Sequence, residues 1–171
     1  MSMDTWRAIN TVRVVREFSE HPIEQADFER ILHAGRRAGS SKNEQKWVFI
    51  AIRGREHLGQ LAEVGRYAGH LAGAAVAVAL VTPDPASASA VWDMGRAAQN
   101  MVLAAWELGI GSVPATVYDH ALAHRLLGLP PDRRCDFLLS FGHPADPSQL
   151  STPNRPGGRR ALAEVVREER W

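Results

Sequence analysis

The sequence predicts a protein of mixed α and β structure, because helical patterns alternate along the chain with short apolar runs typical of strands. The strand candidates are rich in β-branched and aromatic residues and cover positions 48–52, 76–81, 112–117 and 137–141. With 171 residues, the chain is long enough for one hydrophobic core. We therefore expect a single domain over residues 1–171, in which about 144–171 form an extended C-terminal arm and a final helix.

Composition excludes several function classes. The 20 basic and 19 acidic residues leave a net charge of +1, so we expect no nucleic-acid partner and no anionic membrane partner. The longest apolar run, residues 71–81, is too short to span a bilayer, and the N-terminus lacks the apolar core of a signal peptide. The single cysteine, Cys135, excludes an internal disulfide and suits a reducing cytoplasm. We therefore expect a cytoplasmic location.

Helix signals are clear in the first third of the chain. Asp4 is a suitable N-cap for a short helix over residues 4–12. Residues 23–38 place Phe28, Ile31 and Leu32 on one face, and residues 55–66 place apolar side chains inward in the same way. Later in the chain, Asp119 is expected to begin a helix that ends at residue 127, before a Gly-Leu-Pro-Pro stop.

Residues 93–108 form the strongest helix candidate, and it is apolar nearly all round. Such a helix is buried on more than one side, and in a chain this small a partner subunit is needed to complete the burial. We expect the polar pair Gln99-Asn100 to form buried hydrogen bonds within it.

The composition of two expected strands predicts their position in the sheet. The uninterrupted apolar run 76–81 predicts a buried central strand. Pro114 cannot donate to a strand ladder, so the strand at 112–117 is expected at a sheet edge or where a ligand lies against the backbone. The stretch 144–158 is rich in Pro, Ser, Asn and Gly, and is expected to be irregular.

Three polar stretches are candidate binding sites. Residues 39–47, Gly-Ser-Ser-Lys-Asn-Glu-Gln-Lys-Trp, lie between a helix and a strand, and present Ser40, Ser41 and Asn43. Arg13 and Arg16 lie three residues apart, and Arg159-Arg160 follow two glycines. Taken alone, the first stretch is a polar turn after a helix and the arginines are solvated charges. The alternative is a set of contacts to a ligand, in which guanidinium groups grip a phosphate.

Other chemistries find little support. The sequence contains no Walker loop, no Gly-x-Gly-x-x-Gly and no nucleophile elbow. His120 and His124 are four residues apart, but no adjacent acid or cysteine completes a metal site, so no metal is expected. Ser40 and Ser41 lack a motif that supplies a base. The remaining contacts, without an acid–base pair, favour a bound organic cofactor that supplies the reactivity.

The chain resembles the FMN-dependent nitroreductase superfamily over nearly its whole length. The family's early Arg-Arg-Ser-x-Arg-x-Phe is similar to residues 12–18, and its Pro-Ser-Ser-x-Asn-x-Gln-Pro-Trp is similar to residues 39–47. Its buried helix with Gln-Asn and Gly-x-Gly resembles residues 95–111, its strand with Gly-Tyr-Pro resembles residues 138–144, and its closing basic pair resembles residues 159–160. Five motifs in the right order make the resemblance fairly specific.

The resemblance implies an α+β fold with a mostly antiparallel sheet surrounded by helices, and a homodimer with a long buried interface helix and two FMN sites. It implies that each FMN is held by residues of both subunits, and that NAD(P)H is the co-substrate. The implied contacts are Arg13, Val14, Arg16, Arg159 and Arg160 from one subunit, Ser40, Ser41 and Asn43 from the other, and Pro114, Ala115 and Thr116 along the isoalloxazine.

The implied activity is reduction of a small-molecule acceptor, such as a nitroaromatic, a quinone or an enone, by a ping-pong hydride relay. Two departures from the family pattern bear on it. Val12 and Val14 replace an Arg and a Ser, which removes a phosphate or ring contact, and Gly39 and Lys46 replace prolines, which is expected to loosen the turn. A non-catalytic flavin-binding, storage or sensor protein on the same fold therefore remains an alternative.

Overall fold

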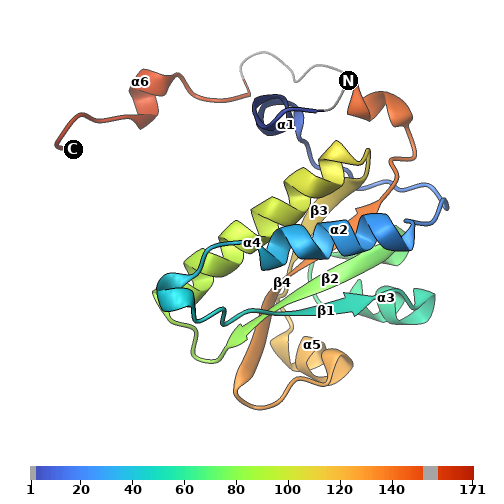
Figure 1. Cartoon of the computed structure of the whole chain (residues 1–171). Coiled ribbons are helices and arrows are strands. Elements are labelled where there is room, and N and C mark those ends of the chain that lie inside the picture. The colour runs from blue at the N-terminus through green and yellow to red at the C-terminus, as the bar shows by residue number, and fades with distance from the viewer. Residues whose placement is uncertain (1–2, 152–157) are drawn as a thin grey trace.

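A computed structural model describes residues 3–151 and 158–171 of the chain (Figure 1). Four strands, β1 (Val48–Ile52), β2 (Val76–Pro83), β3 (Gly111–Thr116) and β4 (Arg133–Gly142), form one sheet. The helices are α1 (Thr5–Thr11), α2 (Gln25–Arg36), α3 (Arg55–Leu61), α4 (Ala88–Glu107), α5 (His120–Leu127) and α6 (Leu162–Val165). Short 3-10 turns are η1 (Ser41–Asn43), η2 (Gly69–Gly73) and η3 (Pro147–Leu150).

The sheet has the strand order β1-β2-β4-β3, and every neighbouring pair is antiparallel. The apolar run in β2 is buried at the centre of the sheet, as its composition predicts. Strand β3 lies at an edge, where Pro114 pairs with Leu139 of β4. The α+β fold with an antiparallel sheet is therefore confirmed.

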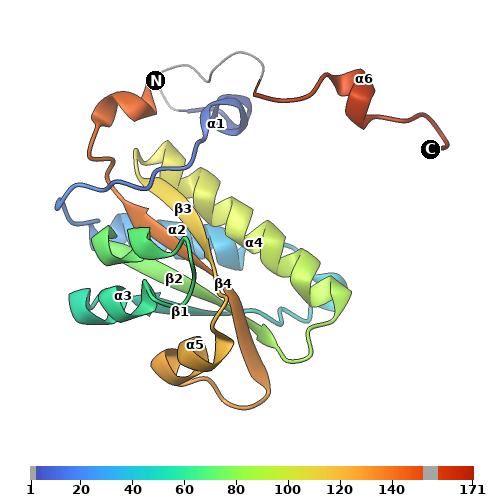
Figure 2. The same ribbon diagram turned by 180° about the vertical axis from the view of Figure 1, so that it is seen from behind.

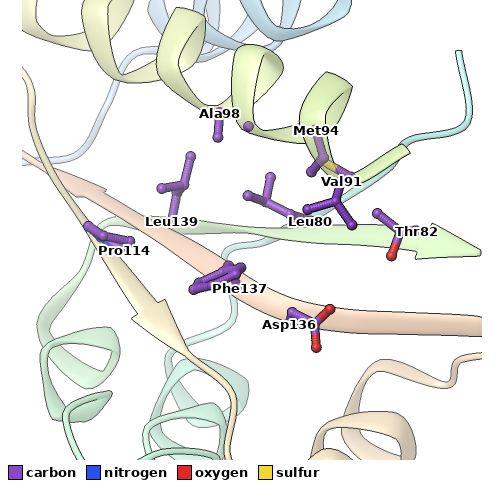
Figure 3. Close-up of a pocket in the computed structure, with 10 residues that line it drawn as sticks. Leu80, Thr82, Val91, Met94, Ala98, Pro114, Asp136, Phe137 and Leu139 are labelled. Carbon is purple, nitrogen blue, oxygen red and sulfur yellow. The ribbon is translucent and has the colours of Figure 1, made fainter. Parts of the chain in front are cut away.

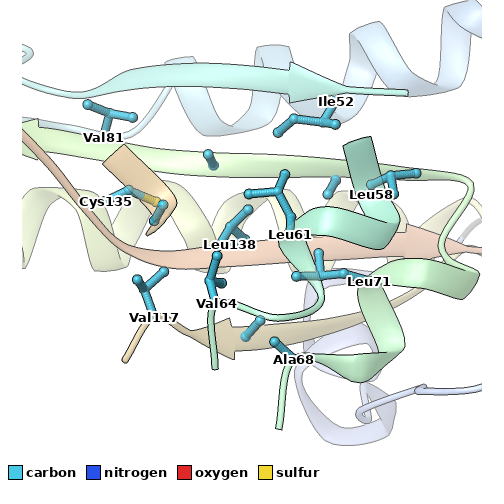
Figure 4. Packing of buried hydrophobic residues seen from close by; sticks show 14 of the residues in the cluster. Ile52, Leu58, Leu61, Val64, Ala68, Leu71, Val81, Val117, Cys135 and Leu138 are labelled. Atoms are coloured by element: carbon cyan, nitrogen blue, oxygen red, sulfur yellow. The ribbon is translucent and has the colours of Figure 1, made fainter. Parts of the chain in front are cut away.

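Helices cover both faces of the sheet (Figures 1 and 2). On one face, α2 and α4 pack over a core that includes Phe28, Met101 and Phe141. On the other face, α3, η2 and α5 cover a second core, which Figure 4 shows around Leu61, Leu138 and Cys135. Alternate residues of each strand supply the two cores, because successive side chains of a strand point to opposite faces.

Several elements differ in length from the sequence expectation. Helix α3 ends at Leu61 rather than at position 66, because the carbonyl of Val64 accepts backbone hydrogen bonds from Tyr118 and Asp119 at 2.8 and 2.9 Å instead of continuing the helix. Helix α4 begins five residues earlier than expected, at Ala88, because the Ser87 side chain accepts from the Ala90 N–H and caps it. The cap predicted at Asp119 is confirmed, since its side chain accepts from Leu122 N at 2.8 Å.

The long helix α4 presents two kinds of surface. Its inner face is buried against the sheet, whereas Trp92 on its outer face is 70% exposed. Asn100 donates to the Ala34 carbonyl at 3.2 Å, as expected, but Gln99 is exposed. Among the described residues, no helix combines the length and apolarity needed to cross a membrane.

The last part of the chain lies apart from the sheet (Figure 1). Every residue from Gly158 to Trp171 is exposed, including the apolar side chains of Leu162, Val165 and Trp171. The final helix is shorter than expected, because α6 spans only Leu162–Val165. Residues 152–157 of the stretch expected to be irregular, with Gly157 among them, lie outside the described residues.

Candidate cofactor site along strand β3

The early arginine segment docks against the first half of β3. Val15 N donates to the Ser112 carbonyl at 3.0 Å, and Val14 bridges Ser112 in a parallel arrangement. A Cβ on Gly111 would lie 2.6 Å from the Val15 Cβ, which is closer than two carbons can pack. The glycine at position 111 therefore allows the segment that carries Arg13 and Arg16 to approach the sheet edge.

The second half of β3 is open on its outer side. The side chains of Pro114 and Thr116 are exposed, whereas the side chain of Ala115 is 1% exposed and packs in the core on the opposite face. Beyond Thr116, the chain around Val64 closes the strand end through its bonds to Tyr118 and Asp119. Of the three residues expected along the isoalloxazine, Ala115 can therefore offer a ligand only its backbone.

A groove of about 670 Å³ brings together residues that are far apart in the sequence. It contains three residues expected to hold a phosphate: Arg13, Val14 and Arg159. The remaining lining residues are Ile9, Asn10, Val12 and Gly158. Arg16 and Arg160 are exposed and do not line this groove. Two guanidinium groups in one groove are suited to an anionic group, because each can donate two parallel hydrogen bonds to it.

An apolar pocket lies on the α4 side of β3 (Figure 3). Its volume is about 290 Å³, and it is lined by Leu80, Thr82, Val91, Met94, Gly95, Ala98, Pro114, Asp136, Phe137 and Leu139. Figure 3 shows Phe137 and Pro114 on neighbouring strands below the helix. Only Thr82 and Asp136 bring polar side chains, so the pocket suits a flat, largely apolar molecule.

The Ser-Ser-x-Asn turn is held by two side chains of α4 that the sequence analysis did not single out. The carboxylate of Asp93 accepts a hydrogen bond from Ser41 N at 2.8 Å, and Arg96 donates to the Gly39 carbonyl at 3.0 Å. A Cβ on Gly39 would lie 2.7 Å from an Arg96 nitrogen, so a larger residue at position 39 would displace the guanidinium. The expected loosening of the turn by Gly39 is therefore offset by these bonds.

The backbone of the turn is strained. Lys42, Asn43 and Gln45 have φ values of 51°, 56° and 48°, in the left-handed region that non-glycine residues rarely adopt. Ser40 Oγ accepts from Gln45 N at 3.1 Å and helps to hold this conformation. Strain of this kind persists where the surrounding structure enforces it, and it concentrates at binding sites.

Within one chain, the turn and the arginine groove lie at opposite ends of α4 (Figure 1). Asp93 holds the turn near the beginning of the helix, whereas Trp106 near its end donates to Thr11 Oγ1 of α1 at 2.9 Å. Trp106 lies thirteen positions after Asp93, which corresponds to about 20 Å along the helix axis. The groove with Arg13 and Arg159 contains none of Ser40, Ser41 and Asn43.

The histidine pair and the cysteine do not form a metal site. His120 lies 3.7 Å from an Asp136 oxygen, an acid that sequence proximity did not reveal. In the part of the chain that the structure describes, no group of three or more His, Cys, Asp or Glu side chains is placed to hold a metal ion. Burial raises the pKa of Cys135 to about 12, so its thiol stays neutral and is structural, as expected.

Comparison with known proteins identifies the family. The model of the nitroreductase family matches residues 9–66 and 59–143. A protein of Archaeoglobus fulgidus with the provisional name NADH dehydrogenase/NAD(P)H nitroreductase is 36% identical over 149 residues, which cover 82% of this chain and 85% of the relative. A protein of Methanothermobacter thermautotrophicus with the same provisional name is 32% identical over 152 residues, which cover 84% of this chain and 79% of that protein.

Solved structures agree with this result. A provisionally named nitroreductase of Desulfovibrio desulfuricans in complex with FMN has a TM-score of 0.80 at 28% identity, covering 100% of this chain and 99% of that one. Nitroreductase A of Vibrio parahaemolyticus has a TM-score of 0.86 at 26% identity, covering 99% and 77% of the two chains. The fold and these relatives thus define an NAD(P)H-dependent oxidoreductase of α+β structure. The chain belongs to the nitroreductase family.

Proposed function

We propose that the protein is an FMN-dependent oxidoreductase that uses NAD(P)H to reduce a small organic acceptor. The observation that carries this proposal is the groove that Arg13 and Arg159 both line, next to the segment in which Val14 bridges Ser112 of β3. Its residues fit a phosphorylated flavin, because the guanidinium groups suit the phosphate and the exposed Pro114 and Thr116 offer a strand edge to the ring. The names of the relatives and the FMN complex of the Desulfovibrio protein support the same cofactor.

In each proposed site, the two chains supply different parts of the binding surface. Arg13 and Arg159 would hold the phosphate, with Val14 in the same groove and with Arg16 and Arg160 adding positive charge nearby. Pro114, Thr116 and the backbone of Ala115 would lie along the ring. Ser40, Ser41 and Asn43 would contact the cofactor from a second subunit, since they lie at the other end of α4 in their own chain.

The same geometry supports a homodimer. Trp92 exposes apolar area on the outer face of α4, and Val91 and Phe137, which are 56% and 45% exposed, line the apolar pocket between α4 and the sheet. Large exposed apolar side chains that cluster on one surface are typical of an interface. An antiparallel pair of α4 helices would bring the turn of one chain to the arginine groove of the other.

FMN held by Arg13 and Arg159 would supply the redox chemistry, which is hydride transfer from NAD(P)H to an acceptor. The side chains of this protein would bind the cofactor and the acceptor and orient them. The guanidinium groups neutralise the phosphate, and the apolar walls of the pocket at Pro114 and Phe137 exclude water from a flat ring such as a nitroaromatic, a quinone or an enone. The proton that accompanies the hydride to the acceptor comes from solvent.

A spectrum of the purified protein tests the cofactor. We expect a yellow chromophore that NAD(P)H bleaches, and mass analysis of the released ligand should identify FMN. Arg159→Gln should weaken FMN binding about tenfold, since bonds to charged groups contribute about 1.5–3 kcal/mol, but should leave riboflavin binding unchanged. Arg167→Gln on the same arm is the matched control. A colourless protein that ignores added FMN would overturn the proposal.

A non-catalytic flavin-binding, storage or sensor protein is the second candidate. It is favoured by Val14, which places an apolar side chain in the groove where the family has a serine. Steady-state oxidation of NAD(P)H with a panel of acceptors separates the two candidates. Sustained turnover supports the oxidoreductase, and a single stoichiometric reduction of bound flavin supports storage or sensing.

A further inference from the structure

His70 is a half-buried histidine beneath β3 that the binding contacts above do not use. It lies in η2, on the face of the sheet opposite α4. Its Nδ1 is 2.8 Å from the Oγ of Ser140, a fully buried residue of β4 that pairs with Val113 of β3. The imidazole thus lies directly behind the strand that carries Pro114.

The second ring nitrogen of His70 is the unusual feature. Nε2 is buried, and among residues 3–151 and 158–171 it makes no hydrogen bond of normal geometry, although the Pro114 carbonyl lies close enough to the ring to favour its protonated form. A buried polar atom without a partner costs about 1–3 kcal/mol, so such an atom in a native protein calls for an explanation such as a bound group or a functional role.

The surroundings of His70 lower the pKa of its ring and so favour the neutral form. Burial lowers the pKa of His70, the positive charge of Arg16 lowers it further, and the Pro114 carbonyl opposes both effects. Arg16 is the charged group that acts on the ring from the early segment, while β3 and β4 contribute the uncharged Pro114 and Ser140. A negative charge arriving at this edge would favour the imidazolium, because an opposite charge nearby stabilises the charged form.

We propose that His70 is the residue that takes up a proton when the cofactor at the β3 edge is reduced. This inference rests on the proposed function. A hydride from NAD(P)H would bring two electrons and one proton to the bound cofactor and would so add one negative charge to it. With Nδ1–H donating to Ser140 Oγ, the lone pair of Nε2 accepts one further proton from solvent. His70 returns that proton to solvent when the acceptor removes the hydride, so atoms and charge balance.

The pH dependence of the reduction potential of the FMN-loaded protein tests this proposal. Each proton taken up with two electrons shifts the potential by about 30 mV per pH unit, since a tenfold change in a two-electron equilibrium is 29.6 mV. From pH 6.5 to 8, we expect a slope of about 60 mV per pH unit in the wild type and about 30 mV in His70→Gln. His57→Gln changes another half-buried histidine, which contacts the Leu126 carbonyl, and should keep the wild-type slope.

A second measurement does not depend on the folding of a variant. In protein labelled with 15N-histidine, the His70 ring should be neutral at pH 7 with oxidised cofactor and protonated after reduction. A wild-type slope of about 30 mV per pH unit, or a ring that stays neutral on reduction, overturns the role of His70 while leaving the oxidoreductase proposal intact. Failure of the protein to bind FMN in a fluorescence titration overturns both.

Discussion

The carboxylate of Asp93 accepts a hydrogen bond from the backbone N–H of Ser41 at 2.8 Å, across 52 positions of the chain. The Asp93 side chain is only 10% exposed, so this bond and the nearby Arg96, at 3.9 Å, compensate for its burial. The same helix therefore fixes the strained turn and carries the exposed apolar face proposed as an interface. In the proposed dimer, cofactor binding and assembly would both depend on α4.

Replacing Asp93 with Asn should weaken FMN binding without unfolding the protein. The change removes the negative charge from a hydrogen bond of the kind that contributes about 1.5–3 kcal/mol, so the Kd for FMN should rise about tenfold or more. Flavin fluorescence quenching measures it. Glu107→Gln on the same helix breaks only an exposed ion pair with Arg30 and should change the Kd little. An unaltered Kd in Asp93→Asn would show that the turn takes no part in binding.

Val14→Ser should tighten FMN binding. Val14 lines the arginine groove and is 45% exposed, so a hydroxyl there can donate to the phosphate. The gain should be about tenfold for FMN and absent for riboflavin, which lacks the phosphate. Val48→Ser provides a control at a valine of similar exposure, 49%, on β1. Equal gains for both flavins would place the phosphate elsewhere.

Trp92→Glu should separate the proposed dimer. A charge at the centre of an apolar interface loses its hydration without gaining a partner, which is costly. Sedimentation should give twice the 18.8 kDa chain mass for the wild type and the single mass for the variant. Arg125→Glu on α5, which covers the opposite face of the sheet, should remain dimeric. A monomeric wild type would contradict the composite site.

Gly111→Ala should destabilise the protein by about 1–3 kcal/mol, because the added methyl group overlaps Val15 in a packed interior. Val15→Ala should recover part of that loss in the double variant, as measured by urea unfolding. Gly59→Ala in α3 meets no atom within 4 Å and should instead stabilise the helix by about 0.5–1 kcal/mol. If the changes in the free energy of unfolding caused by Gly111→Ala and Val15→Ala simply add in the double variant, the two residues are not in contact.

Cys135 makes stability fall at high pH. Its pKa is about 12 in the folded chain against 9.0 for the ordinary thiol, so above pH 9 the unfolded chain loses a proton that the folded chain retains. Unfolding is then favoured as pH rises. Between pH 8 and 10, the free energy of unfolding of the wild type should drop by about 1.4 kcal/mol relative to Cys135→Ala. Parallel pH curves for the two proteins would contradict burial of the thiol.

Local patterns predicted the elements whose ends are set locally. Strand β1 has the bounds expected from its apolar run, and α5 begins at the predicted Asp119 cap. The end of α3 was wrong by five residues, because the Val64 carbonyl is used by residues more than fifty positions later in the chain. No local pattern contains that contact.

Local sequence patterns likewise reveal only some residues of the candidate site. The arginines and the Ser-Ser-x-Asn turn stand out because their polar residue types cluster in the sequence. Asp93 and His70 do not, because their partners Ser41 and Ser140 are 52 and 70 positions away. Asp93 had one available signal, which is a carboxylate in a helix that is otherwise apolar nearly all round.

The separation of the Ser41 turn from the Arg159 groove along α4 has a genetic consequence. In the proposed dimer, a chain damaged only at Asp93 and a chain damaged only at Arg159 would each fail when paired with itself. A mixed pair of the two would concentrate both defects in one pocket and leave the other pocket intact. A mixed pair should therefore keep up to half of the activity of a wild-type dimer. Co-expression of the two damaged alleles should restore activity in this way, as in complementation between subunits.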